Sequence, residues 1–211
     1  MIDVGGTNVK LRDQHHRTPL KIPSGPSLTP RRMVADVRKA VDGWDFSVVS
    51  IGCPAPVTDG KLTEAPRNLG PGWVRFDFGK AFGCPVKVVN DAAMQALGSY
   101  EGGRMLFLGL GTGLGSALIL GGSLAPTELA HLPYRRGRSY EDYVGLRGLQ
   151  RMGKKRWRRH VFRVAEELKN ALGAEYVVLG GGNAKLLGDL PPWARLGNNA
   201  HAFRGGVLLW R

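Results

Sequence analysis

Two glycine-rich loops are the residues whose types and spacing point most directly to chemistry. Residues 3–8 (DVGGTN) end one short apolar run, and residues 108–116 (LGLGTGLGS) follow another. Each pattern predicts a strand that turns sharply through glycines, which tolerate positive φ and let the backbone approach a ligand. Successive backbone amides in such a turn form a concavity that binds anions. Two such loops, about a hundred residues apart, favour two half-domains that hold one phosphate chain.

Glycine-rich turns also occur in proteins without any ligand. The chain has 31 glycines, so an ordinary tight turn is the alternative interpretation of either loop alone, and it is less favoured for both loops together. Neither loop has the Gly-Lys-Ser/Thr of a Walker A motif. The second loop also misses the third glycine of the dinucleotide fingerprint, because the pattern from Gly109 leads to Leu114 and the pattern from Gly111 leads to Ser116. A Rossmann dehydrogenase is therefore disfavoured.

Two aspartates are placed where phosphate chemistry needs them. Asp91 follows the apolar run of residues 86–89 and opens a helical pattern. An aspartate there is either a helix N-cap or a general base at the carboxyl edge of a sheet, and its position alone leaves both open. A base accepts the proton of a sugar hydroxyl that attacks a phosphoryl group. Asp3, just before the first loop, is suited to hold Mg²⁺, directly or through water, because Mg²⁺ usually takes one or two carboxylates beside phosphate oxygens and water.

Glu128 and His131 form a third candidate group. Three residues apart, they share one face if the segment is helical, and both side chains can bind hydroxyls. A surface pair and a fragment of a metal site are the alternatives. Metal catalysis is disfavoured because no second cluster of His and Cys supports it.

The composition limits the class of protein. The chain has 211 residues, of which 43% are hydrophobic, enough for one compact domain or two small lobes. No stretch approaches the ~20 apolar residues of a membrane span, and no signal peptide is visible. Cys53 and Cys84 form neither a disulfide framework nor a zinc cluster, so two reduced thiols are expected. These features predict a cytoplasmic protein.

The charge is strongly positive. A net charge of +13 attracts polyanions, and nucleic acid, nucleotide and inorganic polyphosphate are all candidates. The densest basic run is residues 154–160 (KKRWRRH), with residues 135–138 (RRGR) upstream. Apolar residues recur at helical spacing through residues 157–168, which leaves the charges on one face. A solvated helix face is the simplest interpretation of this run.

The elements that position these residues follow from periodicity and turn signals. Apolar runs predict strands at 1–4, 9–11, 47–52, 86–90, 105–108, 116–120 and 176–179. Helices are predicted at 30–41, 77–82, 139–152 and 154–172, and others start at 91 and 184, whereas 13–30 and 57–75 are expected to be loops. Strand and helix alternation with interspersed hairpins predicts an α/β fold with a mixed sheet. Such folds bind ligands at glycine-rich strand ends.

Six segments occur in the order found in the ROK family of sugar kinases. They are residues 3–8, 52–57 (GCPAPV), 90–92 (NDA), 109–115, 128–131 (ELAH) and 179–182 (LGGG). The sequence resembles this family along nearly its whole length. Residues 126–129 (PTEL) and 195–200 (RLGNNA) look most like its polyphosphate glucokinase branch. The resemblance implies an actin-like ATPase (ribonuclease-H-like) fold with two small lobes around a central cleft, residues 1–90 in one lobe and residues 91–211 in the other.

The resemblance also implies roles. Asp91 matches the catalytic base, and the sugar-binding set is Asn68, Asn90, Glu128, His131 and Glu141. The phosphate- or nucleotide-binding set is Asp3, Gly5, Gly6, Thr7, Gly111, Thr112, Gly113, Gly181 and Gly182, with Asp3 also holding Mg²⁺. The implied enzyme is a glucokinase that transfers a phosphoryl group from polyphosphate, ATP or both to the 6-hydroxyl of glucose. A homodimer is expected, and neither a membrane nor nucleic acid is an expected partner.

Some features depart from the family pattern. The cysteine-rich zinc cluster that usually follows the sugar-site histidine is missing, so no structural zinc is expected, and Ala130 stands where Gly is common. Few residues precede Asp3, so the chain start is either truncated or naturally reduced. An alternative is an inactive protein of the same fold that binds a sugar, a polyanion or nucleic acid. Retention of Asp3, Asp91 and both loops favours the enzyme, and a polyphosphate donor gives a function to Arg135, Arg136, Arg138, Lys154, Lys155 and Arg158.

Overall fold

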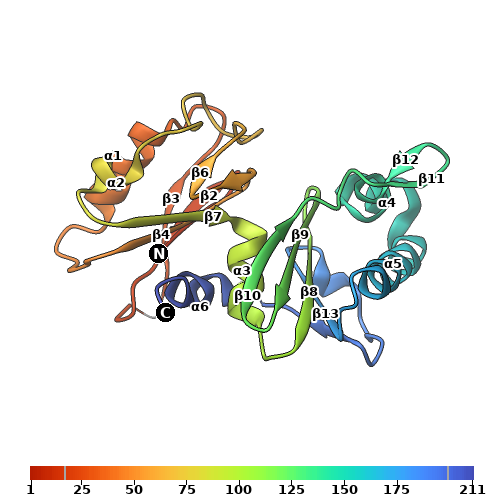
Figure 1. Cartoon of the computed structure of the whole chain (residues 1–211). Helices are drawn as coiled ribbons and strands as arrows, with labels where there is room; N and C mark the ends of the chain where they lie inside the picture. The colour runs from red at the N-terminus through yellow and green to blue at the C-terminus, as the bar shows by residue number, and fades with distance from the viewer. Residues whose placement is uncertain (17, 199) are drawn as a thin grey trace. The chain divides into compact units, whose positions relative to one another are not determined.

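The chain folds into two compact units, each built on a five-stranded mixed sheet (Figure 1). The structure, a computed structural model, describes residues 1–16, 18–198 and 200–211, without the side chain of Pro126. The first unit is Met1–Met94 with Ala202–Arg211, and the second is Gln95–His201. The chain passes between them within α3 (Asp91–Ser99) and again at the start of α6 (His201–Leu208).

The sheet of the first unit has the order β3-β2-β1-β4-β7. Its strands are β1 (Ile2–Val4), β2 (Asn8–Leu11), β3 (Leu20–Pro23), β4 (Val49–Cys53) and β7 (Val86–Asn90). β1, β4 and β7 are parallel, and β2 and β3 run antiparallel to their neighbours. Because parallel strands end at the same edge, the segments after β1, β4 and β7 emerge side by side.

Short helices complete the first unit. α1 (Pro30–Ala40) begins where the Thr29 side chain accepts a hydrogen bond from the Arg32 amide, and it buries Met33, Val34 and Val37. α2 (Phe78–Phe82) is capped by Asp77, and β5 (Val57–Thr58) and β6 (Lys61–Leu62) form a small hairpin. These elements close a core that includes the fully buried Trp73.

The last ten residues also belong to the first unit. Ser50 Oγ donates to the carbonyl of Gly206 in α6, and the same hydroxyl oxygen accepts a hydrogen bond from Trp210 Nε1 at 2.8 Å. Lys87 Nζ donates to the carbonyl of Leu209 at 2.6 Å and lies over the Trp210 ring. The division expected from the sequence, at residues 90 and 91, placed this segment in the second lobe. The structure differs because β4 and β7 provide hydrogen-bond partners for the C-terminal segment.

The sheet of the second unit has the order β10-β9-β8-β13-β14. Its strands are β8 (Arg104–Leu110), β9 (Leu114–Leu120), β10 (Ser123–Thr127), β13 (Tyr176–Gly180) and β14 (Ala194–Leu196). β8, β13 and β14 are parallel, so β8 and β13 end at one edge, whereas β9 and β10 are antiparallel. A single-turn helix, η1 (Ala184–Leu186), follows β13.

The helical part of the second unit lies between β10 and β13 in the sequence. β11 (Pro133–Arg135) and β12 (Arg138–Ser139) form a hairpin before α4 (Tyr140–Val144) and α5 (Leu146–Ala171). Gly153 has φ 72° and ψ 161°, which interrupts α5 where the sequence predicts the boundary between two helices. α5 buries Trp157, Val161 and Val164 against the sheet. No described helix is long and apolar enough to cross a membrane.

Candidate active site

The first glycine loop and Asp91 lie at the same edge of the first sheet. Asp3 pairs with Gly52 across β1 and β4, and Gly52 pairs with Val89 across β4 and β7. A Cβ atom at Gly52 would lie 3.1 Å from Met94 Sδ and 3.6 Å from Asp91 Cα. A glycine at position 52 therefore lets the first turns of α3 approach the sheet closely.

The first loop is held by backbone contacts and by neighbouring side chains. Gly5 N donates to Asn8 O at 3.0 Å, and Ser24 N donates to Thr7 O at 3.0 Å. Ser24 Oγ also donates to Gly5 O. A Cβ atom on Gly6 would lie 3.4 Å from Asn68 Cβ. The structure thus brings the predicted sugar-binding residue Asn68 next to the first glycine loop.

Asp3 is paired with a lysine. Its carboxylate lies 3.1 Å from Lys10 Nζ, and the Asp3 side chain is only 14% exposed. The two residues face each other in the antiparallel register of β1 and β2. Mg²⁺ takes one or two carboxylates and completes its shell with water and phosphate oxygens, so the Asp3 carboxylate fits as one ligand, in competition with Lys10.

Asn90 and Asp91 share the start of α3. The Ala92 N–H lies 2.9 Å from Asn90 Oδ1 and 2.8 Å from Asp91 Oδ1. Asn90 Nδ2 donates to Ala55 O at 3.2 Å, which fixes its amide between the segment after β4 and the helix. Asn90 is thus the capping residue, and Asp91 is the first helical residue, where the helix dipole favours a negative charge. Burial, and then the negative charge of Asp91, raise the pKa of the Cys53 thiol.

The second glycine loop connects β8 to β9 and is held by Glu141. Glu141 Oε2 accepts a hydrogen bond from Leu114 N at 3.1 Å, and a Cβ atom on Gly113 would overlap this oxygen. Leu146 N donates to Thr112 O at 3.2 Å. The side chain of Glu141 and the start of α5 therefore fix the loop from one side.

The turn after β13 packs on the same loop. Asn183 N donates to Leu110 O at 2.9 Å, and Asn183 Nδ2 donates to Gly111 O at 3.0 Å. Gly181 has φ 84°, and a Cβ atom there would lie 2.5 Å from Leu110 O. The predicted residues Gly181 and Gly182 are thus next to the second loop. Asn183 was not among the predicted site residues, although it directly follows the glycine run.

Glu128 and His131 lie on the segment after β10, which is not helical, so they do not share a helix face. Both residues are exposed. Ser116 Oγ holds the start of this segment, because it donates to Thr127 O at 2.8 Å and accepts from Leu129 N at 3.3 Å. Ser116 was also missed, and its place at the end of the second loop motif was the available signal.

The structure divides the predicted residues between the two units. The first unit holds Asp3, Gly5, Gly6, Thr7, Asn68, Asn90 and Asp91. The second holds Gly111, Thr112, Gly113, Glu128, His131, Glu141, Gly181 and Gly182. In each set, the glycine loop follows a strand whose parallel neighbour ends at the same edge of the sheet.

Comparisons with known proteins show what this chain is similar to. No family model matches the chain. The polyphosphate glucokinase of Mycobacterium tuberculosis is 27% identical, over 86% of this chain and 76% of that protein. The solved structure of an inorganic polyphosphate/ATP-glucomannokinase from Arthrobacter sp. strain KM has a TM-score of 0.80 and 23% identity, over 99% of this chain and 96% of that one. A ROK family glucokinase from Streptomyces griseus, solved with glucose and AMPPNP, has a TM-score of 0.75 and 19% identity, over 99% of this chain and 97% of that one.

The two mixed sheets have the fold of the ROK and actin-like ATPase structures, so the predicted fold class is confirmed. The resemblance to ROK-family sugar kinases is confirmed as well, and the similar proteins include polyphosphate glucokinases.

Proposed function

We propose that the protein is a ROK-type glucokinase that transfers a phosphoryl group from inorganic polyphosphate, ATP or both to the 6-hydroxyl of glucose. The observation that carries the proposal is the carboxyl edge of the first sheet, where the glycine loop after β1 and Asp91 after β7 follow parallel strands that are joined through β4. The similar polyphosphate glucokinase and glucomannokinase support the choice of donor and sugar.

Asp91 is the general base of the proposed reaction. Its carboxylate takes the proton of the glucose 6-hydroxyl as that oxygen attacks the terminal phosphorus of the donor. A new O–P bond forms, the bond from phosphorus to the bridging oxygen breaks, and the electron pair stays on the departing phosphate. The Asn90 cap supports this role because it fixes the helix turn that carries Asp91.

The glycine loop of each unit is the phosphate-binding element of the proposal. The loop amides around Gly6 and Gly113 donate hydrogen bonds to the phosphate oxygens, and the turn at Gly181 and Gly182 binds the nucleoside side when ATP is the donor. Asp3 holds Mg²⁺, which neutralises charge on the phosphates when bound. The Lys10 ammonium beside Asp3 adds a fixed positive charge to the same edge.

The sugar-binding set of the proposal is Asn68, Asn90, Glu128, His131 and Glu141. Glu141 has a double role, because one of its oxygens accepts the Leu114 amide and the carboxylate is left with further acceptor positions for a sugar hydroxyl. The proposal also includes a cytoplasmic location, on the composition, and a homodimer, on the family resemblance alone.

The first experiment measures glucose 6-phosphate formation by the purified protein with Mg²⁺ and polyphosphate, ATP or no donor. Turnover with either donor supports the kinase. No turnover with both donors, across a panel of hexoses, contradicts the proposal and favours a binding protein of the same fold.

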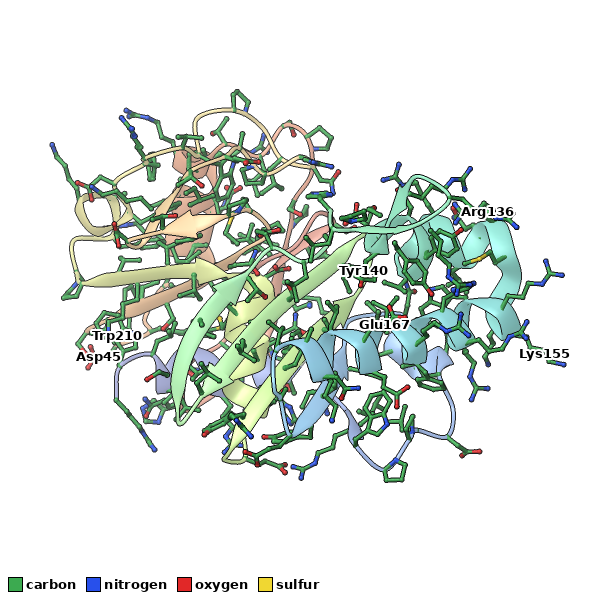
Figure 2. The ribbon with its side chains drawn as sticks, turned by 45° about the vertical axis from the view of Figure 1, so that its right-hand side comes forward. Asp45, Arg136, Tyr140, Lys155, Glu167 and Trp210 are labelled. Carbon is green, nitrogen blue, oxygen red and sulfur yellow. The ribbon has the colours of Figure 1, made fainter. Side chains whose placement is uncertain are left out.

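The Asp91→Asn variant tests the base. We expect kcat to fall by about 10²–10⁴-fold, the usual contribution of general base catalysis, while glucose binding stays within about twofold. Asp45→Asn, an exposed aspartate of the same unit (labelled in Figure 2), is the matched control and should keep full activity. Equal turnover of Asp91→Asn and Asp45→Asn would show that Asp91 is not the base.

A further inference from the structure

The charge of the second unit is concentrated in one stretch. Residues 133–163 contain eleven Lys and Arg side chains and two acidic ones, Glu141 and Asp142. Both acidic side chains lie near one arginine, since Arg147 Nη2 is 3.6 Å from Glu141 and 3.9 Å from Asp142. The remaining basic side chains of the stretch greatly outnumber the carboxylates within it. Such a surface repels itself and attracts anions.

Aromatic rings hold some of these basic side chains in place. Tyr134 of the hairpin and Tyr143 of α4 both contact the ring of His160 on α5, with Tyr134 Oη 3.0 Å from His160 Nδ1. The guanidinium of Arg135 lies over the Tyr134 ring at 5.5 Å, and that of Arg151 lies over the Tyr143 ring at 5.2 Å. Stacking on a ring holds a guanidinium plane in place. Arg151 is also held by a hydrogen bond from its Nη2 to the Asp142 carbonyl at 2.7 Å.

Two further arginines flank the same histidine. Arg159 precedes His160, and Arg163 follows it by about one helical turn; both are exposed. Burial and the positive charges of Arg135, Arg163, Arg159 and Arg151 lower the pKa of His160. We call these four residues the arginine cluster. They come from a hairpin and from both parts of α5, so the fold brings together charges that are up to 28 positions apart.

The cluster continues along the surface. Lys155, Arg159 and Arg163 follow one another at intervals of four residues on the exposed side of α5, a distance of about 12 Å along the helix. Figure 2 shows Lys155 and Arg136 pointing outward at the same end of the second unit, one from α5 and the other from the hairpin. A row of this length matches a chain of phosphates better than a single phosphate group.

One residue expected on this surface lies elsewhere. The guanidinium of Arg158 lies over Phe162, and its Nη2 would be 3.1 Å from a Cβ atom on Gly188. Arg158 is half-buried and turned toward the segment after η1, so it is not part of the cluster.

We propose that the arginine cluster binds the distal phosphates of an extended inorganic polyphosphate chain, outside the loops that hold the reacting end. The inference rests on the proposed donor. Planar guanidinium groups match phosphate oxygens with paired N–H donors, and the stacking of Arg135 and Arg151 on tyrosine rings reduces the entropy lost on binding. A donor with only three phosphates does not need this surface, so the cluster selects long chains over ATP.

The test measures binding, so that it does not depend on turnover. The triple variant Arg135→Gln, Arg159→Gln and Arg163→Gln is compared with Arg31→Gln, Lys39→Gln and Lys61→Gln, which removes the same charge from exposed positions of the first unit. Affinities are determined for long-chain polyphosphate, for tripolyphosphate and for a single-stranded oligonucleotide, at two salt concentrations.

We expect the cluster variant to lose about tenfold or more in affinity for long-chain polyphosphate and to show a weaker salt dependence, while tripolyphosphate binding stays the same. The control variant should lose much less. Equal losses in both variants would overturn the proposal, since only net charge would then matter. Tighter binding of the oligonucleotide than of polyphosphate would overturn the choice of partner. If the wild-type protein binds polyphosphate through the cluster without phosphorylating glucose, the proposed function fails and the binding surface stands.

Discussion

Two glycines of the second loop have very different surroundings. A Cβ atom on Gly113 would overlap Glu141 Oε2, whereas one on Gly111 would meet no atom within 4 Å. Neither residue has the left-handed φ that only glycine adopts easily, so space alone distinguishes them. The close packing at Gly113 keeps the Glu141 carboxylate on the Leu114 amide.

Gly113→Ala should therefore destabilise the protein and Gly111→Ala should not. We expect a loss of about 1–3 kcal/mol in unfolding free energy for Gly113→Ala, because the methyl group displaces Glu141. The control Gly111→Ala should change stability by less than about 0.5 kcal/mol. Urea unfolding of both variants checks this, and equal stabilities would mean that Glu141 moves aside at little cost.

Cys53 carries a second prediction at the residue scale. Its side chain is fully buried, and burial together with the Asp91 charge raises its pKa from the ordinary value of 9.0. In the folded protein the thiol therefore stays neutral at pH values where the unfolded chain loses the proton. The stability contributed by this difference is complete below pH 9.0 and is lost as the pH rises above it.

The Cys53→Ala variant isolates this effect. The alanine lacks the thiol, so the stability advantage of the wild-type protein over the variant should shrink as the pH rises from about 8 to about 10. Above the ordinary pKa, we expect the unfolding free energy of the wild-type protein, relative to that of the variant, to fall by up to about 1.4 kcal/mol per pH unit. Denaturant unfolding at several pH values measures the difference, and a difference that is constant with pH contradicts the prediction.

At this scale positions were easier to predict from the sequence than contacts. The pattern placed Asp91 after a buried strand but left open whether it caps the helix, and the structure gives the cap to Asn90. The choice between the two depends on side-chain directions within one turn, which a sequence pattern does not contain. The pairing of Asp3 with Lys10 depends on the register of β1 and β2, which no local sequence pattern contains.

The elements of the core were predicted well, because their apolar runs are long and buried. β4, β7, β8, β9 and β13 all fall within a few residues of predicted strands. β3, β10 and β14 were missed, and they are short strands at the sheet edges with exposed residues. Their backbone partners, and not their own side chains, make them strands. α6 was missed for a similar reason, since only three of its eight residues are buried.

Docking of α6 on the first sheet gives a prediction at the element scale. Ser50 Oγ donates to Gly206 O and accepts from Trp210 Nε1, so Ser50→Ala leaves two polar groups without these partners. We expect a loss of about 1–3 kcal/mol in unfolding free energy and faster amide hydrogen exchange in α6. Ser47→Ala, an exposed position two residues before β4, is the control and should change neither quantity. Unchanged exchange in α6 for Ser50→Ala would show that other contacts hold the helix.

At the scale of the whole molecule, the two units repeat one arrangement, in which parallel strands deliver glycine loops to one sheet edge. Strand and helix alternation was enough to predict the α/β class. The return of the last ten residues to the first unit was not predictable, because nothing in a local pattern tells which sheet a terminal helix will meet. The two passages of the chain between the units follow from this return.

The net charge of +13 acts on the whole molecule and distinguishes the proposed donors. Polyphosphate carries many more charges than ATP, so its attraction to the protein should be screened more strongly by salt.

Between about 0.05 M and 0.5 M NaCl, where the screening length falls from about 14 Å to about 4 Å, we expect kcat/KM for polyphosphate to fall about tenfold or more. For ATP the loss should be about threefold or less, and the KM of uncharged glucose, measured with ATP, serves as the control and should stay constant. Kinetics with both donors across this range measure the two slopes. Parallel slopes would mean that the positive charge does not discriminate between the donors and serves some purpose other than donor recognition.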